Sequence, residues 1–109
     1  EMKRFENLVF DTSHYAIAGI DIFTAWDELG DRVRHIHLSN NYLKGIDDHA
    51  LPFEGRLPLD RFLRRLYRDG FDGKITLELG PGPLEARLGK ERIVRNLRRS
   101  REFCEEYFA

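Results

Sequence analysis

Three short runs of the chain have the pattern of β-strands, and each run is followed by a segment with helical periodicity. They cover residues 8–10, which are all apolar, and residues 33–38 and 75–79, in which polar and apolar positions are interspersed. The segments that follow cover residues 21–30, 58–70 and 90–108, and their apolar positions recur as on one face of an amphipathic helix. Strands that alternate with amphipathic helices predict right-handed βαβ crossovers and a parallel sheet.

The predicted helices have terminal signals and apolar faces. Asp21 is a candidate N-cap, and Gly30 and Gly70 close the first and second helices. The apolar stripe of the second helix consists of Leu59, Phe62, Leu63, Leu66 and Tyr67. The inward positions of the third helix are Ile93, Leu97 and Cys104. We therefore expect Cys104, the only cysteine, to be a small packed hydrophobe rather than a reactive thiol.

The two faces of the predicted strands differ in polarity. One face carries Leu8, Phe10, Ile36, Leu38, Ile75, Leu77 and Leu79, and the other carries Val9, Asp11, His35, His37, Thr76 and Glu78. A doubly wound sheet is covered on both faces, so both faces read as apolar. A closed barrel instead has helices outside and polar groups at the C-terminal mouth of its interior. The pattern therefore favours three βα units of a parallel (β/α)8 TIM barrel.

Length and composition limit what this chain can be. A complete barrel of eight units needs about 250 residues, whereas the chain has 109 residues and a formal net charge of −1. We expect one domain over residues 1–109 that is an incomplete barrel, either missing its N-terminal part or completing its sheet by oligomerising. No apolar stretch approaches the length of a membrane span and no secretory signal is present, so we expect a cytoplasmic protein without a membrane partner.

Three residues that can bind metal fall at the C-terminal ends of three different predicted strands. Asp11, His37 and Glu78 all face the polar side. Carboxylate and imidazole groups together suit divalent metals such as Mn²⁺, Zn²⁺, Co²⁺, Fe²⁺ or Mg²⁺, and three ligands leave positions open for substrate oxygens. His14, just after the first strand, is placed to contact metal or substrate. Taken alone, an aspartate at a strand end is more often a turn former or a helix cap than a ligand, and Asp11-Thr12-Ser13 is typical of an Asx or ST turn.

The connection of residues 40–57 is long for a loop, and loops of this length at a barrel mouth are typically lids or binding loops. Asp47 and His49 are candidate ligands of a further metal. Arg56 is a candidate partner of a phosphate or carboxylate group. Tyr42 is a candidate substrate contact, although aromatic residues more often serve packing.

The ordered motifs resemble a known superfamily. The stretches LVFDTSHYAIAG, RHIHLSN and DDHALPFEGRLPLDRFLRRLYRDGFDGKITLEL are similar to the C-terminal part of the xylose isomerase-like TIM barrel superfamily. That superfamily includes sugar-phosphate isomerases and epimerases and the endonuclease IV type of apurinic-site nuclease. The resemblance implies that the three strands are the sixth, seventh and eighth of the barrel.

The resemblance also implies residue roles. Asp11, His37 and Glu78 match the superfamily's metal ligands, and His14 matches a histidine that contacts substrate in epimerases or a second metal in nucleases. Asp47 and His49 match a pair that binds an additional zinc in the nucleases. Two departures stand out: the sequence Phe-Glu-Gly at residues 53–55 replaces the usual Gly-Glu-Gly, and a glutamate from an earlier strand, which forms half of the acid/base pair, has no counterpart here.

Three functions are compatible with these features. The first is a metal-dependent isomerase or epimerase of a small sugar or sugar phosphate, with Glu78 and His14 as its catalytic candidates and with little or no activity in this chain alone. The second is a zinc-dependent apurinic-site nuclease, which the near-neutral charge and the lack of a basic stripe disfavour. The third is a degenerate, non-catalytic half-barrel module.

Overall fold

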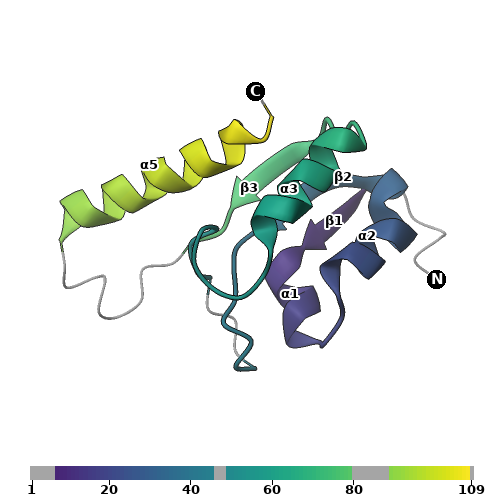
Figure 1. Cartoon of the computed structure of the whole chain (residues 1–109), viewed down its shortest axis with the longest axis horizontal. Helices are drawn as coiled ribbons and strands as arrows, with labels where there is room; N and C mark the ends of the chain where they lie inside the picture. The colour runs from purple at the N-terminus through teal and green to yellow at the C-terminus, as the bar shows by residue number, and fades with distance from the viewer. Residues whose placement is uncertain (1–6, 46–48, 80–88, 109) are drawn as a thin grey trace.

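The computed structural model describes residues 7–45, 49–79 and 89–108. Its strands are β1 (Leu8–Asp11), β2 (Val33–Leu38) and β3 (Lys74–Leu77), and its helices are α1 (Thr12–Ile17), α2 (Ile22–Leu29), the 3-10 turn η2 (Gly30–Arg32), α3 (Leu59–Arg68) and α5 (Lys90–Glu106). The strands form one sheet in the order β1-β2-β3 with both pairs parallel (Figure 1). The predicted parallel sheet of three βα units is therefore confirmed.

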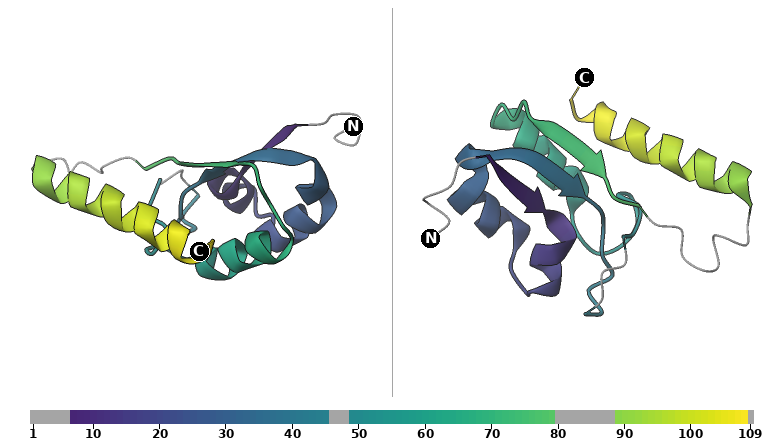
Figure 2. Two further views of the ribbon diagram at one scale, coloured as in Figure 1. Left: turned by 90° about the horizontal axis from the view of Figure 1, so that it is seen from above. Right: turned by 180° about the vertical axis from the view of Figure 1, so that it is seen from behind.

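All the helices lie on one side of the sheet (Figure 2). On that side Phe10, Ile36 and Leu38 are fully buried. On the opposite side the sheet has no covering layer among the described residues, and Val9 is 53% exposed. The expected division into an apolar face and a polar face is confirmed, because side chains alternate along each strand.

Aromatic rings join the sheet to the two helices that cover it. The Phe10 ring stacks on Phe62 of α3 at 5.5 Å and meets the edge of Trp26 of α2 at 5.7 Å. The indole N–H of Trp26 donates to Asp69 Oδ2 at 2.9 Å, so its one polar atom is satisfied at the end of the core. Arg65 also donates to Asp69 at 2.8 Å, which ties α3 to the same carboxylate.

The strand boundaries follow the sequence pattern closely. The bounds of β2 are those predicted. β1 extends through Asp11, and β3 ends at Leu77, two residues before the predicted end. Glu78 still donates its N–H to the Leu38 carbonyl at 3.1 Å, so the chain keeps its place beside β2 just past the strand.

Helix α1 was not predicted. The sequence of Asp11-Thr12-Ser13 is typical of a turn or a helix cap, and the structure shows that Asp11 is the N-cap of α1, because its Oδ1 accepts from the His14 N–H at 2.9 Å. With six residues and two of them polar and buried, α1 has no apolar stripe that periodicity can detect.

Two predicted inward positions are wrong. Tyr67 is 57% exposed and lies at the margin of the core, where its ring meets Phe108 at 6.0 Å. Leu97 is 46% exposed because the N-terminal half of α5 extends away from α3 and the sheet (Figure 1). Cys104, in the C-terminal half, is buried in the core as expected. Among the residues that the structure describes, no helix is both long and apolar enough to cross a membrane.

Candidate metal centre

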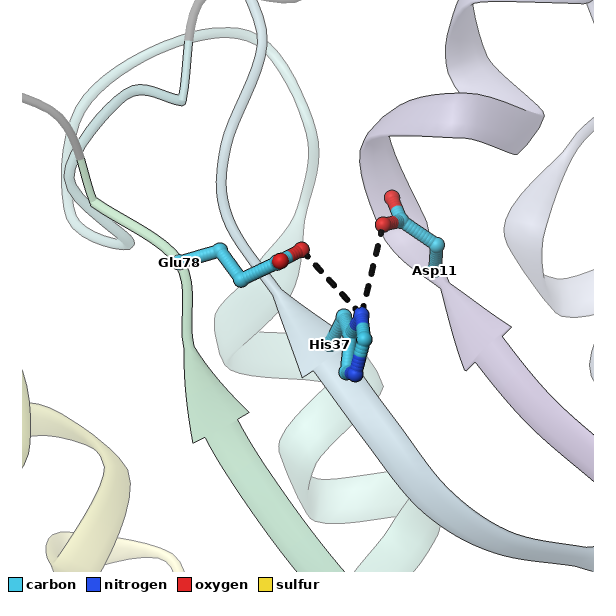
Figure 3. Close-up of side chains that lie close together, drawn as sticks. All are labelled: Asp11, His37 and Glu78. Carbon is cyan, nitrogen blue, oxygen red and sulfur yellow. Dashed lines mark ion pairs between the residues drawn. The ribbon is translucent and has the colours of Figure 1, made fainter.

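Asp11, His37 and Glu78 converge on the uncovered face of the sheet, at the C-terminal ends of the strands (Figure 3). Asp11 pairs directly with His37 across β1 and β2. His37 pairs with Thr76 across β2 and β3, and Glu78 follows two residues later, so that alternation returns it to the same face. The parallel register thus brings three distant positions to one point.

The distances within this group suit one cation. His37 Nδ1 lies 3.3 Å from Glu78 Oε1 and 3.9 Å from Asp11 Oδ2. One ligand atom from each residue lies within 4.8 Å of the others. Donor atoms around a divalent ion with bonds of about 2.1 Å lie roughly 3 to 4 Å apart, so the set is close to that spacing. The side chains are 14% to 35% exposed, which leaves them accessible to small molecules.

The electrostatic arrangement also favours a positive charge between these groups. Both carboxylates face the same ring nitrogen of His37. Two partly buried carboxylates that point at one place repel each other unless a cation lies between them. A protonated imidazole or a bound metal ion would compensate the negative charge of the two carboxylates. A metal ion bound by a neutral imidazole and both carboxylates would satisfy all three side chains at once.

The ring of His35 packs against the ring of His37 on the same face of β2. Its Nε2 lies 2.6 Å from Thr76 Oγ1, and its ring meets the His37 ring edge to face with centroids 4.8 Å apart. The contact limits the rotation of the His37 side chain, which helps to keep its Nδ1 directed at the two carboxylates.

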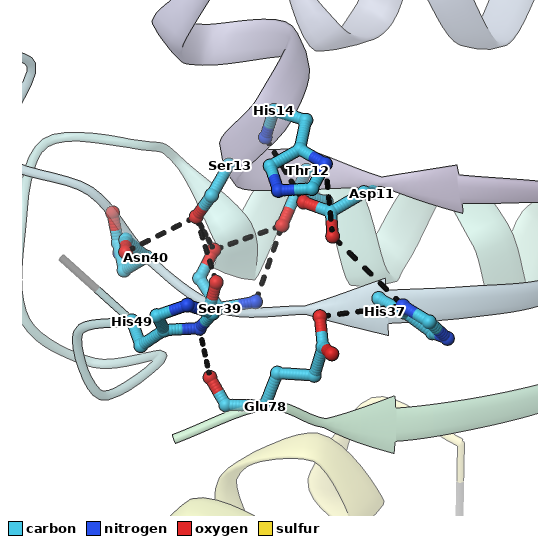
Figure 4. Close-up of polar contacts among 9 residues, drawn as sticks. All are labelled: Asp11, Thr12, Ser13, His14, His37, Ser39, Asn40, His49 and Glu78. Carbon is cyan, nitrogen blue, oxygen red and sulfur yellow. Dashed lines mark hydrogen bonds and ion pairs between the residues drawn. The ribbon is translucent and has the colours of Figure 1, made fainter. Parts of the chain in front are cut away.

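His14 lies at the margin of the group (Figure 4). Its Nδ1 is 3.6 Å from Asp11 Oδ2, and its side chain is 66% exposed. One helical turn separates Asp11 from His14, which places the imidazole beside the carboxylate and open to solvent. The contact with metal or substrate that the sequence predicts for His14 stays a prediction.

The structure brings His49 near the group without placing it within it. Among the described residues, the possible metal ligands that gather are Asp11, His37 and Glu78. His49 Nδ1 instead lies 3.2 Å from the main-chain carbonyl of Glu78 (Figure 4). Asp47 lies outside the described residues. The further metal predicted for Asp47 and His49 is therefore untested.

Tyr42 and Arg56 belong to the long loop that follows β2. The Tyr42 hydroxyl donates to Glu54 Oε2 at 3.2 Å, and its side chain is 39% exposed. The side chain of Arg56 is exposed, while its N–H donates to the Asn41 carbonyl at 2.8 Å. Their predicted contacts with substrate stay predictions.

A cluster of buried polar residues next to the site was not predicted. Its members are at most 2% exposed, and they are Thr12, Ser13, Ser39, Asn40 and Asn41. Polar residues buried together must form hydrogen bonds, and these link α1 to the end of β2 (Figure 4). The only signal in the sequence is the polar run Ser-Asn-Asn directly after the buried end of β2.

Asn40 organises the long loop. Its Nδ2 donates to the carbonyls of Pro52 and Leu57 at 3.1 and 3.0 Å. Its Oδ1 accepts from the N–H groups of Asn41 and Leu57 at 2.7 and 2.8 Å. The main chain of Asn40 also forms a two-way bridge with Ala50 at 2.9 and 3.0 Å. The loop therefore closes around one fully satisfied amide.

Comparisons with known proteins agree on one family. The model of the family described as xylose isomerase-like TIM barrel matches residues 4–106. Fructoselysine 3-epimerase of Escherichia coli O157:H7 is 34% identical over 58 residues, which are 53% of this chain and 21% of that protein. Inosose dehydratase of Mesomycoplasma hyopneumoniae strain 7448 is 30% identical over 101 residues, covering 75% of this chain and 33% of that protein.

A solved structure leads to the same family. The crystal structure of a D-tagatose 3-epimerase-like protein superposes with a TM-score of 0.56 and 26% identity, over 88% of this chain and 36% of that one. The chain spans about a fifth to a third of the length of these curated relatives. The family match over residues 4–106 agrees with the parallel strands and the helices on one face of the sheet. The chain belongs to the xylose isomerase-like TIM barrel family.

Proposed function

We propose that this chain carries the metal-binding part of the active site of an isomerase or epimerase that acts on a small sugar or sugar phosphate. The observation that carries the proposal is the convergence of Asp11, His37 and Glu78 at the C-terminal edge of a parallel sheet. Active sites of TIM barrels lie at this edge. The names of the relatives, which are sugar epimerases and an inosose dehydratase, support carbohydrate chemistry.

The donor set fits a divalent metal. Two carboxylates and one imidazole suit Mn²⁺, Zn²⁺ or Co²⁺, and Mg²⁺ is a weaker match because it prefers oxygen ligands. Asp11, His37 and Glu78 would hold the ion. When bound, the ion supplies positive charge that polarises the hydroxyl and carbonyl oxygens of a sugar.

The side chains of this chain then have distinct tasks. Glu78 is 35% exposed at the end of β3, so its carboxylate can take a proton from a sugar carbon beside a carbonyl group. His14 is exposed at the margin and can donate a hydrogen bond to a sugar oxygen. Return of the proton to the opposite face of that carbon needs a second acid/base group, which we assign to a part of the enzyme other than this chain.

Calorimetric titration of the chain with Mn²⁺ and with Zn²⁺ tests the proposal. We expect one ion per chain and a loss of affinity of at least tenfold in Glu78→Gln and in His37→Ala, because each removes a ligand. Glu28→Gln is the matched control, since Glu28 is an exposed glutamate of α2 outside the group. An affinity of Glu78→Gln equal to that of the unmodified chain contradicts the proposal.

The same titration separates the alternatives. More than one zinc per chain, with the additional zinc lost in His49→Ala, supports the apurinic-site nuclease. A folded chain that binds neither Mn²⁺ nor Zn²⁺ supports the degenerate module. Either result replaces the isomerase proposal.

A further inference from the structure

Strands β1 and β2 part immediately after the residues that face each other in the metal centre. The last pair of their backbone ladder is Asp11 with His37. Beyond this pair, the segment that follows β1 turns into α1, and the segment that contains β2 continues through Leu38 to Ser39. Without a further strand pair, some other contact must hold the two segments at this separation.

The hydroxyl of Thr12 supplies that contact. Thr12 Oγ1 donates to the Ser39 carbonyl at 2.8 Å and accepts from the Ser39 N–H at 3.2 Å. A single side-chain oxygen therefore satisfies both main-chain groups of Ser39, as a residue of a neighbouring strand would.

Ser13 adds a second link to the same residue. Its Oγ lies 2.7 Å from Ser39 Oγ, 3.1 Å from the Ser39 carbonyl and 3.3 Å from the Asn40 carbonyl. Thr12 and Ser13 are fully buried and Ser39 is 2% exposed. Because water cannot readily replace these bonds, losing one leaves an unsatisfied buried group and allows the two segments to move apart.

We propose that Thr12, Ser13 and Ser39 form a hydroxyl clamp that sets the separation of Asp11 and His37. The clamp begins one residue after Asp11 and ends two residues after His37, so it acts on both ligands at short range. Asp11 is also the N-cap of α1, so any shift of the helix moves the carboxylate with it. As far as it concerns metal affinity, this inference rests on the proposed function. The three residues are buried and act through Asp11 and His37, so they are positioning residues.

The first test compares two substitutions of one residue. Thr12→Val keeps the shape of the side chain and removes the hydroxyl, whereas Thr12→Ser keeps the hydroxyl. We expect the affinity for Mn²⁺, measured by calorimetry, to fall about 10- to 100-fold in Thr12→Val and to stay within about threefold in Thr12→Ser. Thr24→Val is the matched control, because the Thr24 hydroxyl donates to Asp21 Oδ2 at 3.1 Å at the start of α2, outside the metal centre.

Two results overturn the clamp. One is an affinity of Thr12→Val equal to that of the unmodified chain. The other is an equal loss in Thr12→Ser and Thr12→Val, which shows that the hydroxyl is not the relevant group. Circular dichroism of each variant confirms that the affinities are compared between folded chains. If Thr12→Val does not fold, Ser39→Ala removes only the Oγ link, and we expect a loss of about threefold to tenfold.

A second measurement does not depend on metal. The distance from Asp11 Oδ2 to His37 Nδ1 is 3.9 Å in the unmodified chain. Crystal structures of the unmodified chain and of Thr12→Val would compare this distance directly. We expect this distance to grow in Thr12→Val and to remain in Thr12→Ser. If the unmodified chain binds no ion, the proposed function fails, and this distance alone decides the clamp: an unchanged separation in Thr12→Val overturns it.

Discussion

Asp11 and His37 face each other across β1 and β2, with Asp11 Oδ2 3.9 Å from His37 Nδ1. The other carboxylate oxygen of Asp11, Oδ1, accepts from the N–H of His14 and caps α1. One side chain thus divides its two oxygens between the helix and the candidate metal centre. The two tasks can be separated by substitution, because an amide can cap a helix but is a poor ligand for a divalent metal.

We predict that Asp11→Asn lowers the affinity for Mn²⁺ at least tenfold and changes the free energy of unfolding by less than about 0.5 kcal/mol, since asparagine caps helices as well as aspartate does. Asp11→Ala loses the cap as well and costs about 1 kcal/mol. Calorimetry and urea denaturation measure the two quantities. Unchanged metal affinity in Asp11→Asn contradicts the assignment of Asp11 as a ligand.

A second prediction concerns the loop that closes around Asn40. Gly55 has φ +90°, and an added Cβ would lie 2.6 Å from Asn40 Oδ1. Gly55→Ala therefore incurs both backbone strain and a clash with the amide that holds the loop, and we expect a loss of about 2 to 3 kcal/mol in the free energy of unfolding.

Gly70→Ala is the control for that substitution. Gly70 has φ +75°, and an added Cβ would meet no described atom within 4 Å. Only the backbone strain remains, which costs about 1 kcal/mol. Equal losses in the two variants, measured by urea denaturation, show that the contact with Asn40 has no energetic role.

The third prediction follows from the carboxylate at the other end of the core. The hydrogen bond from the Trp26 indole, together with Arg65, lowers the pKa of Asp69 below its ordinary value, against the smaller opposing effect of burial. A carboxyl group with a lowered pKa in the folded state stabilises the fold above its unfolded pKa of about 3.9 and loses that contribution as the pH falls through the folded pKa.

Denaturation of the unmodified chain and of Asp69→Asn between pH 7 and pH 2.5 measures this effect. Below about pH 4 we expect the unmodified chain to lose stability relative to Asp69→Asn. The reason is that an aspartate at position 69 takes up a proton, whereas an asparagine there does not titrate. Since Asp69 is 34% exposed, solvent screening keeps the effect modest. The prediction is contradicted if the difference in the free energy of unfolding between the unmodified chain and Asp69→Asn stays the same from pH 7 to pH 2.5.

The fourth prediction concerns the thiol of Cys104. Burial raises its pKa to about 11, with a smaller contribution from Glu105. At pH 8 only about one thiol in a thousand is then ionised, against roughly a quarter of exposed thiols. We expect alkylation by iodoacetamide to be at least about tenfold slower in the folded chain than in the same chain in urea. Equal rates show that the helix carrying Cys104 opens readily.

The candidate ligands were predictable because the rule that selects them is local. Side chains alternate along a strand, so Asp11, His37 and Glu78 read as polar positions on one face, at the ends of three apolar runs. The register of the parallel sheet then brings them within 4.8 Å of one another, as the pattern predicts. Their role as ligands stays a prediction until an ion is titrated.

The hydroxyl cluster was not predictable from the sequence, because the partners are distant along the chain. Ser13 and Ser39 are 26 residues apart, and Thr12 and Ser39 are 27 apart. Serine and threonine near a strand end are typical of exposed turns. Only the fold shows that these hydroxyls are buried and bonded to one another.

The sequence by itself determined the order of the three strands and the three longer helices, the covered face of the sheet and the set of residues available for metal binding, because periodicity and polarity are properties of neighbouring positions. Tertiary structure alone decided which polar groups are buried, how far Asp11 lies from His37, and that His49 Nδ1 lies beside the main-chain carbonyl of Glu78. Those features depend on how segments pack across the sheet, and packing brings together residues whose separation along the chain carries no periodic signal.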